Sequence, residues 1–358
     1  MSDFSAAYRP TIAALALAAA ATASAAPLDP LAYASLGALS LGAGNYTLDT
    51  GGALPRLLDA SATVLFVGVL QVQADAFNPW VAVFDFDSVT IAAGAVITAS
   101  GNNPVALLSR SGLNFAGTLD AAGRNGGNQN AGLGGRGGPG GGAGGTGGGG
   151  EAAPGGGPGG GAGGYPGLGN GSWGEGGAYG GLGSNWNPAR TSALPYGDPR
   201  LVLQGGSGGG ASGANLFGAG GGGGGGGVEF GALDFIFFSG GSKLLVHGGL
   251  GGDGLAVNAG GGSGGGALVH APLVTLESSN LGPSIIDASG MSGGRISFLT
   301  GDATVAGNLA SVSVGASFWG QVGVITYSQL SAVPEPAPAA LLAAGLLALA
   351  LRGRKKAG

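Results

Sequence analysis

Two glycine tracts constrain this chain more than any other feature. Of its 358 residues, 86 are glycine; residues 123–183 hold 34 of these, and an unbroken run of eight starts at Gly220. Glycine loses more backbone freedom on folding than other residues and adds no apolar side chain to offset that loss. We therefore expect 123–200 and 205–227 to be long loop insertions without a packed core. Glycine-rich sheets or polyproline-like helices are the alternative.

Aromatic side chains are embedded in the first tract. These residues are Tyr165, Trp173, Tyr179 and Trp186. They give the inserted segment a means of attachment to the rest of the protein.

Short strand signals flank the tracts and carry a repeated pattern. Two apolar or β-branched residues, small residues and a final glycine recur at 97–101, 119–123 and 286–290, with a looser copy at 245–249. The first two copies start 22 residues apart. A spacing in the twenties is typical of one turn of a solenoid, and β-branched runs between small-residue turns indicate strands.

These signals predict an all-β protein, and specifically a parallel β-helix whose coils stack about 4.8 Å apart. The alternation assigns inward positions to Ile91, Ile97, Leu119, Leu276 and Ile286, and outward positions to Thr90, Thr98 and Asn114. An antiparallel β-sandwich is the alternative, because it has the same alternation. The expected body has a first part at 26–122, the glycine-rich insertion at 123–200, and a second part at 201–332.

The N-terminus has the features of a secretory signal peptide over residues 1–25. Arg9 provides a basic start, an alanine-rich apolar stretch follows, and Ala23 and Ala25 form a small-residue cleavage site that leaves Ala26 at the mature end. We therefore expect export through the secretion machinery.

The C-terminal segment 333–358 has three parts in a fixed order. Val333-Pro334-Glu335-Pro336 is followed by an apolar run over 337–351 and by the basic residues Arg352, Arg354, Lys355 and Lys356. The prolines keep the backbone extended, the apolar run predicts a transmembrane helix, and the basic tail opposes translocation. This order predicts a membrane anchor with the body outside the cytoplasm.

The segment resembles the PEP-CTERM sorting signal of Gram-negative bacteria, in which a membrane enzyme, an exosortase, cleaves near the tripeptide. The resemblance is carried by Pro334-Glu335-Pro336, the apolar run and the basic end. It implies an exosortase substrate that is anchored transiently in the inner membrane and then reaches the cell envelope, cell surface or extracellular matrix. A simple tail anchor is the alternative. The body loosely resembles the glycine-rich secreted β-helix proteins that carry this signal.

The charge distribution argues against nucleic-acid binding. Between residues 26 and 334 there are eight basic and sixteen acidic residues, a net charge of about −8, and the basic residues form no stripe. We expect extracellular polysaccharide as a partner instead. The absence of cysteine excludes disulfides and thiolate metal sites.

Candidate catalytic residues are few. Asp85 and Asp87 alternate with phenylalanines, which would place both carboxylates on one strand face about 7 Å apart, a separation suited to an inverting glycosidase. A polysaccharide-active hydrolase or lyase is therefore the enzymatic alternative, and two solvated acids are the simpler interpretation. One match to a calcium-binding nonapeptide at 248–256 lacks the tandem copies such sites need, and His247 and His270 have no acidic neighbour in sequence. We expect no cofactor, no metal and no catalytic residue, and a structural or adhesive role.

Overall fold

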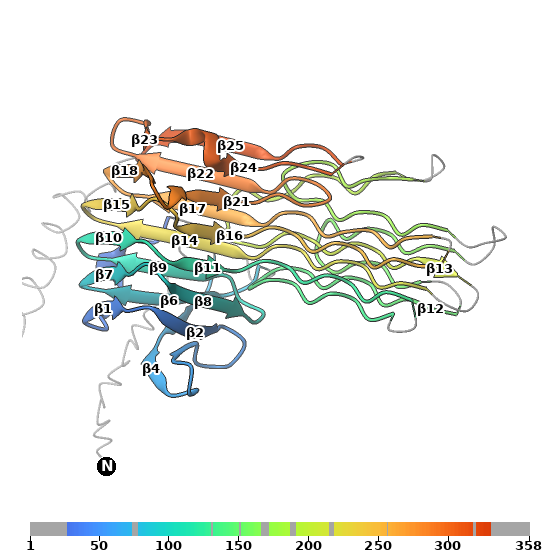
Figure 1. The fold of residues 1–358 in the computed structure, drawn as a ribbon, viewed down its shortest axis with the longest axis horizontal. Helices are drawn as coiled ribbons and strands as arrows, with labels where there is room; N and C mark the ends of the chain where they lie inside the picture. The colour runs from blue at the N-terminus through green and yellow to red at the C-terminus, as the bar shows by residue number, and fades with distance from the viewer. Residues whose placement is uncertain are drawn as a thin grey trace, which may run out of the picture.

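The structure is a computed structural model that describes residues 27–330 except 74–77, 130–131, 150–151, 166–171, 187–190, 215–217, 256 and 318–319. It confirms the all-β class. Figure 1 shows stacked strands at one end of an elongated molecule and long, closely spaced segments that project from them at the other end. Two 3-10 turns, η1 (Pro30–Ala32) and η2 (Leu309–Ser311), are the helical elements of the described part. Neither turn is long and apolar enough to cross a membrane.

Three large sheets contain most of the strands, and we number them I to III. Sheet I has the order β1 (Ala38–Leu41), β7 (Ser88–Ile91), β10 (Gly112–Phe115), β15 (Phe235–Phe238), β18 (Leu273–Leu276), β23 (Ala306–Gly307). Sheet II has the order β24 (Val312–Ser313), β21 (Ile285–Asp287), β16 (Lys243–Leu245), β11 (Thr118–Asp120), β8 (Ala95–Ser100), β2 (Gly44–Asp49), β3 (Arg56–Leu58), β4 (Val64–Val67). Sheet III has the order β25 (Val324–Gln329), β22 (Arg295–Thr300), β17 (Gly266–His270), β14 (Gly227–Ala232), β9 (Val105–Ser109), β6 (Val81–Phe86), β5 (Val69–Gln71).

The chain passes through these sheets in a constant order. From β6 onward it visits sheets III, I and II in turn, and each pass adds one strand beside the strand of the pass before. These neighbours pair in parallel, for example β6 with β9 and β8 with β11. Antiparallel pairing occurs at β2–β3, β3–β4 and β5–β6, and in the small ladder of β19 (Ser278–Ser279) with β20 (Gly282–Pro283). An antiparallel sandwich does not have this pattern.

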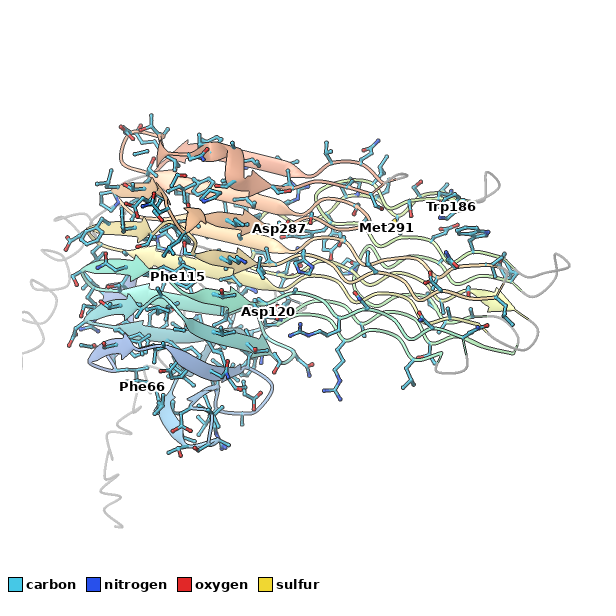
Figure 2. The ribbon with its side chains drawn as sticks, in the orientation of Figure 1. Phe66, Phe115, Asp120, Trp186, Asp287 and Met291 are labelled. Carbon is cyan, nitrogen blue, oxygen red and sulfur yellow. The ribbon has the colours of Figure 1, made fainter. Side chains whose placement is uncertain are left out.

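The main core lies between the three sheets. Its members include the five side chains assigned inward positions from the sequence, Ile91, Ile97, Leu119, Leu276 and Ile286. Phe115 (labelled in Figure 2), Phe230 and Phe238 pack on one another with ring centroids 5.3–5.8 Å apart. Thr90 and Asn114 are exposed and Thr98 is half-buried, as their outward assignment requires.

The repeated pattern stacks in register across sheet II. Leu119 pairs with Ile97 of one neighbouring pass and with Leu244 of the other, and Leu244 pairs with Ile286. The 22-residue spacing therefore corresponds to one pass. The looser copy at 245–249 is one residue out of register with the other copies, because Leu244 and not Leu245 is the inward member. A one-residue slip reverses the face to which every side chain points.

The glycine tracts form a packed bundle, which corrects the prediction of loops without a core. The bundle is built from connections between sheets II and III, mainly residues 121–226 and 246–265. In Figure 1 these segments run side by side away from the strands. Most glycines of 218–227 are buried, and β12 (Gly148–Gly149) pairs with β13 (Gly213–Ala214) within the bundle.

Backbone hydrogen bonds hold the bundle together with a three-residue period. The amides of Gly135 and Gly138 donate to the carbonyls of Gly221 and Gly224 at 2.8 and 2.9 Å. Those of Gly142 and Gly145 donate to Gly206 and Gly209 at 2.8 and 2.9 Å. Three residues per turn is the period of polyproline II, so the structure matches the polyproline-like alternative. The loop prediction was wrong because it considered only the burial of apolar side chains. It left out the hydrogen bonds that glycine backbones make with one another.

A second apolar layer covers the outer face of sheet III. Leu28 and Tyr33 from the segment 27–36 pack there with Leu203 against Val81 and Val83 of β6. Because sheet III is covered on both faces, all six residues of β6 are buried.

Candidate functional site

Several predicted site residues lie outside the described part of the chain. These are the signal cleavage residues Ala23, Ala25 and Ala26, the motif Val333-Pro334-Glu335-Pro336, the apolar run, and the basic residues Arg352, Arg354, Lys355 and Lys356. Their roles stay predictions.

Asp85 and Asp87 do not form the accessible carboxylate pair that alternation predicted. Asp85 is 2% exposed and lies on the covered outer side of β6. Asp87 follows the end of that strand and is exposed. The prediction failed because it treated the outer face as solvated, whereas the segment 27–36 covers it.

Asp85 instead holds the covering segment in place. Its Oδ2 accepts a hydrogen bond from Nε of Arg110 at 3.0 Å, and the same guanidinium donates to the carbonyl of Tyr33. The amide of Leu36 donates to the backbone carbonyl of Asp85 at 2.8 Å. Burial raises the pKa of Asp85 to about 6, although the hydrogen bond from Arg110 opposes the rise.

We expect Asp85 to make stability depend on pH. A carboxyl whose pKa is raised by folding contributes stability below its unfolded pKa of about 3.9, and this contribution is lost as the pH rises through 6. From pH 4 to pH 7 the loss should be about 2–3 kcal/mol. Chemical denaturation at both pH values should show this loss shrinking in Asp85→Asn but not in the control Asp253→Asn, which changes an exposed carboxyl in the glycine bundle. Equal pH dependence in both variants would contradict the assignment.

A buried His270–Glu229 pair lies on the same outer face and was missed from the sequence. Nε2 of His270 lies 2.9 Å from Oε1 of Glu229, which also accepts the amide of Leu28 at 2.6 Å. The imidazole lies against Gly231, where an added Cβ would overlap the ring. The available signal was the glycine that begins each strand: Gly227 pairs with Gly266, and in the same register Gly231 pairs with His270. Both side chains are buried under the covering segment, so the pair serves the fold.

His247 and the calcium-like nonapeptide gather no metal-binding cluster. Nδ1 of His247 lies 3.1 Å from the carbonyl of Gly248, and the amide of Asp253 donates to Oδ1 of Asn128 at 3.0 Å. Among the residues that the structure describes, no three His, Cys, Asp or Glu side chains come together.

Accessible polar chemistry is concentrated where the β sheets meet the glycine bundle. A recess of about 610 Å³ there is lined by Asp49, Ser100, Asn102, Arg124 and Arg136, with small residues between them. We call it the junction recess. Its volume lies within the range of ligand sites, about 300–1,000 Å³. Asp120, labelled in Figure 2 where sheet II meets the bundle, pairs with Arg124 through Oδ2 and Nη1 at 2.9 Å.

The bundle also carries an aromatic pair. Trp173 and Trp186 pack with ring centroids 4.6 Å apart and an interplanar angle of 32°, and Trp173 is 39% exposed. Figure 2 shows Trp186 far out along the bundle, away from the sheets. Tyr179, in contrast, is fully buried against Tyr196 and lies 5.9 Å from the guanidinium carbon of Arg295 of β22. Tyr179 thus anchors the tract, while Trp173 of the tryptophan pair is exposed and Trp186 is half-buried.

Comparison with protein-family models, with curated proteins and with solved structures gave no match.

Proposed function

We propose that this chain is an exported cell-surface or extracellular-matrix protein with a structural or adhesive role, and that its three sheets form a parallel β-helix. The constant order of passes and the parallel register of the 22-residue repeat support the β-helix. The observation that carries the role is the projecting glycine bundle. Its hydrogen-bonded interior makes it a stiff arm, and it holds the Trp173–Trp186 pair away from the β body.

The route to the surface rests on the two chain ends. Secretion through the predicted signal peptide would place the body outside the cytoplasm. The likeness of 333–358 to the PEP-CTERM signal supports transient anchoring in the inner membrane of a Gram-negative bacterium and processing by an exosortase. The enzymatic alternative has lost its main support, because Asp85 is buried and ion-paired instead of facing a groove with Asp87.

The adhesive role is tested on the tryptophan pair. In the producing bacterium, Trp173→Ala with Trp186→Ala should reduce cell attachment to polysaccharide-coated glass by at least about fivefold, because flat indole faces supply much of the contact energy of such surfaces. The control is Leu133→Ala with Leu250→Ala, which truncates two side chains of the same bundle that are each 67% exposed. Thermal melting of the purified variants should show that all remain folded.

Two outcomes distinguish the tryptophan pair as the adhesive surface from the adhesive role of the whole protein. If attachment is unchanged in the tryptophan variant but lost in a strain without the protein, the tryptophan pair is not the adhesive surface. If loss of the whole protein also leaves attachment unchanged, the adhesive role is refuted.

A further inference from the structure

The junction recess exists because two kinds of connection meet there. Between β8 and β9 the chain crosses from sheet II to sheet III in four residues, 101–104. The equivalent crossing after β11 takes residues 121–226 and builds the bundle. The bundle therefore overhangs the short turn of the pass below, and this step forms the recess. Figure 1 shows the bundle leaving the sheets beyond β11 while β2 and β8 keep short connections.

Gly101 and Asn102 of the turn 101–104 line the floor of the recess, and hydrogen bonds of the neighbouring residues brace this turn. Oγ1 of Thr50 donates to the carbonyl of Asn103 at 2.6 Å, and Nδ2 of Asn103 donates to the carbonyl of Thr50 at 2.7 Å. Gly101 has a φ of +122° and approaches the backbone of Gly51 so closely that an added Cβ would overlap it. The amide of Gly140 donates to the carbonyl of Gly101 at 3.2 Å, which ties the bundle to this floor. A preformed floor lowers the ordering cost of binding.

Two arginines project from paired backbone positions above this floor. The amide of Arg124 donates to the carbonyl of Arg136 at 2.8 Å, so the two residues are neighbours on adjacent segments of the bundle. The three-residue period places Arg136 in line with Leu133 among glycines that carry no side chain. Both side chains are exposed, so they protrude from an otherwise bare surface.

The two guanidinium groups differ in their partners. Arg124 is neutralised by Asp120, whereas Arg136 has no acidic partner among the described residues and is exposed at the recess. A guanidinium offers two parallel donors that match a carboxylate. Asp49, Ser100 and Asn102 add hydrogen-bonding groups of the kind that bind sugar hydroxyls.

The surrounding charge decides which carboxylates fit. Asp49 lines the recess, and residues 26–334 carry sixteen acidic against eight basic residues. This field repels a dense polyanion such as nucleic acid or polygalacturonate. It admits a single carboxylate flanked by neutral sugars, whose charge meets Arg136 and whose hydroxyls meet the polar side chains.

We propose that the junction recess binds an acidic sugar unit, a uronate, within a polysaccharide whose other units are neutral, with Arg136 holding the carboxylate. This inference deepens the proposed function, on which its biological setting rests, by naming the chemical class of the polymer. It uses a surface separate from the Trp173–Trp186 pair.

The test is affinity electrophoresis of the purified mature chain in native gels that contain gellan, whose glucuronate units are separated by neutral sugars. We expect gellan to retard the wild-type protein. Arg136→Ala should weaken binding about tenfold or more, and Arg136→Lys should lose part of it, because lysine keeps the charge without the paired donors. The control Lys243→Ala removes an equal charge from an exposed position on β16 outside the recess, and it should bind normally.

Polymer controls identify the recognised group. Gellan with its carboxyls reduced to alcohols, and neutral pullulan, should not retard the protein, and polygalacturonate should do so less than gellan. Unretarded wild-type protein, equal retardation by reduced gellan, or unchanged binding by Arg136→Ala would each overturn the proposal. If cells still attach through the tryptophan pair in that case, the proposed function stands and only the acidic-sugar site is refuted.

Discussion

Replacing Gly221 by alanine is expected to lower the free energy of unfolding by about 4 kcal/mol or more. Gly221 is buried in the bundle, where its amide donates to Gly145 and its carbonyl accepts from Gly135, both at 2.8 Å. An added Cβ would overlap the carbonyl oxygen of Gly209, which is backbone and cannot rotate away. Separating the segments would leave buried amides and carbonyls unpaired, at about 1–3 kcal/mol for each group.

A matched control lies in the same tract. Gly148 is exposed, an added Cβ there would contact nothing within 4 Å, and its φ is not in the positive range. Gly148→Ala should be neutral or stabilising by up to about 1 kcal/mol, because alanine reduces the freedom of the unfolded chain. Urea denaturation of both variants measures the difference. Similar stabilities would mean that the glycine tracts are loops after all.

The β body could be predicted from the sequence because its signal is local. Strand side chains alternate with a period of two, so Ile97 and Thr98 take opposite faces whatever the strand pairs with. The 22-residue spacing then places Leu119 on Ile97. The ambiguous case was a pair of adjacent leucines, where composition alone could not select Leu244 over Leu245.

The bundle could not be predicted because its contacts leave no side-chain pattern. Gly135 bonds to Gly221 and Gly222 bonds to Gly260, so the partners are 86 and 38 residues apart and are all glycine. Sequence reasoning finds strands from the periodicity of apolar side chains, and a glycine tract has none. Bulky side chains do not supply the missing pattern either, because Leu133 and Leu250 are exposed whereas Tyr179 is fully buried.

The candidate site depended on the same missing information. Asp85 seemed accessible because nothing in β6 indicates that residues 27–36 cover its outer face. The pairing of Arg124 with Arg136 across the bundle required the register of two glycine segments. The two arginines are visible in the sequence. The recess is not, because it arises where a short connection in one pass is followed by a much longer connection in the next pass.

Ile286→Asn is expected to cost about 3–5 kcal/mol of unfolding free energy. Ile286 has no exposed surface and stacks between Leu244 and Val312 in the inward column of sheet II. The substitution removes a buried aliphatic side chain and places an amide among apolar neighbours that offer it no hydrogen-bond partner. The defect should propagate little along the column, because each pass is also held by its ladders in sheets I and III.

Thr98→Asn introduces the same side chain at a position on the outer face of the same sheet, where Thr98 is half-buried and pairs with Asp120. Because a surface amide there can bind water, the cost should stay within about 0.5 kcal/mol. Urea titrations at one pH give both values. Comparable losses at the two positions would be incompatible with a core enclosed by the three sheets. If only Ile286→Asn causes a large loss, the stacked side chains of the inward column limit the stability of the β body. Parallel pairing of the strands sets that column, and the bundle projects from the same body.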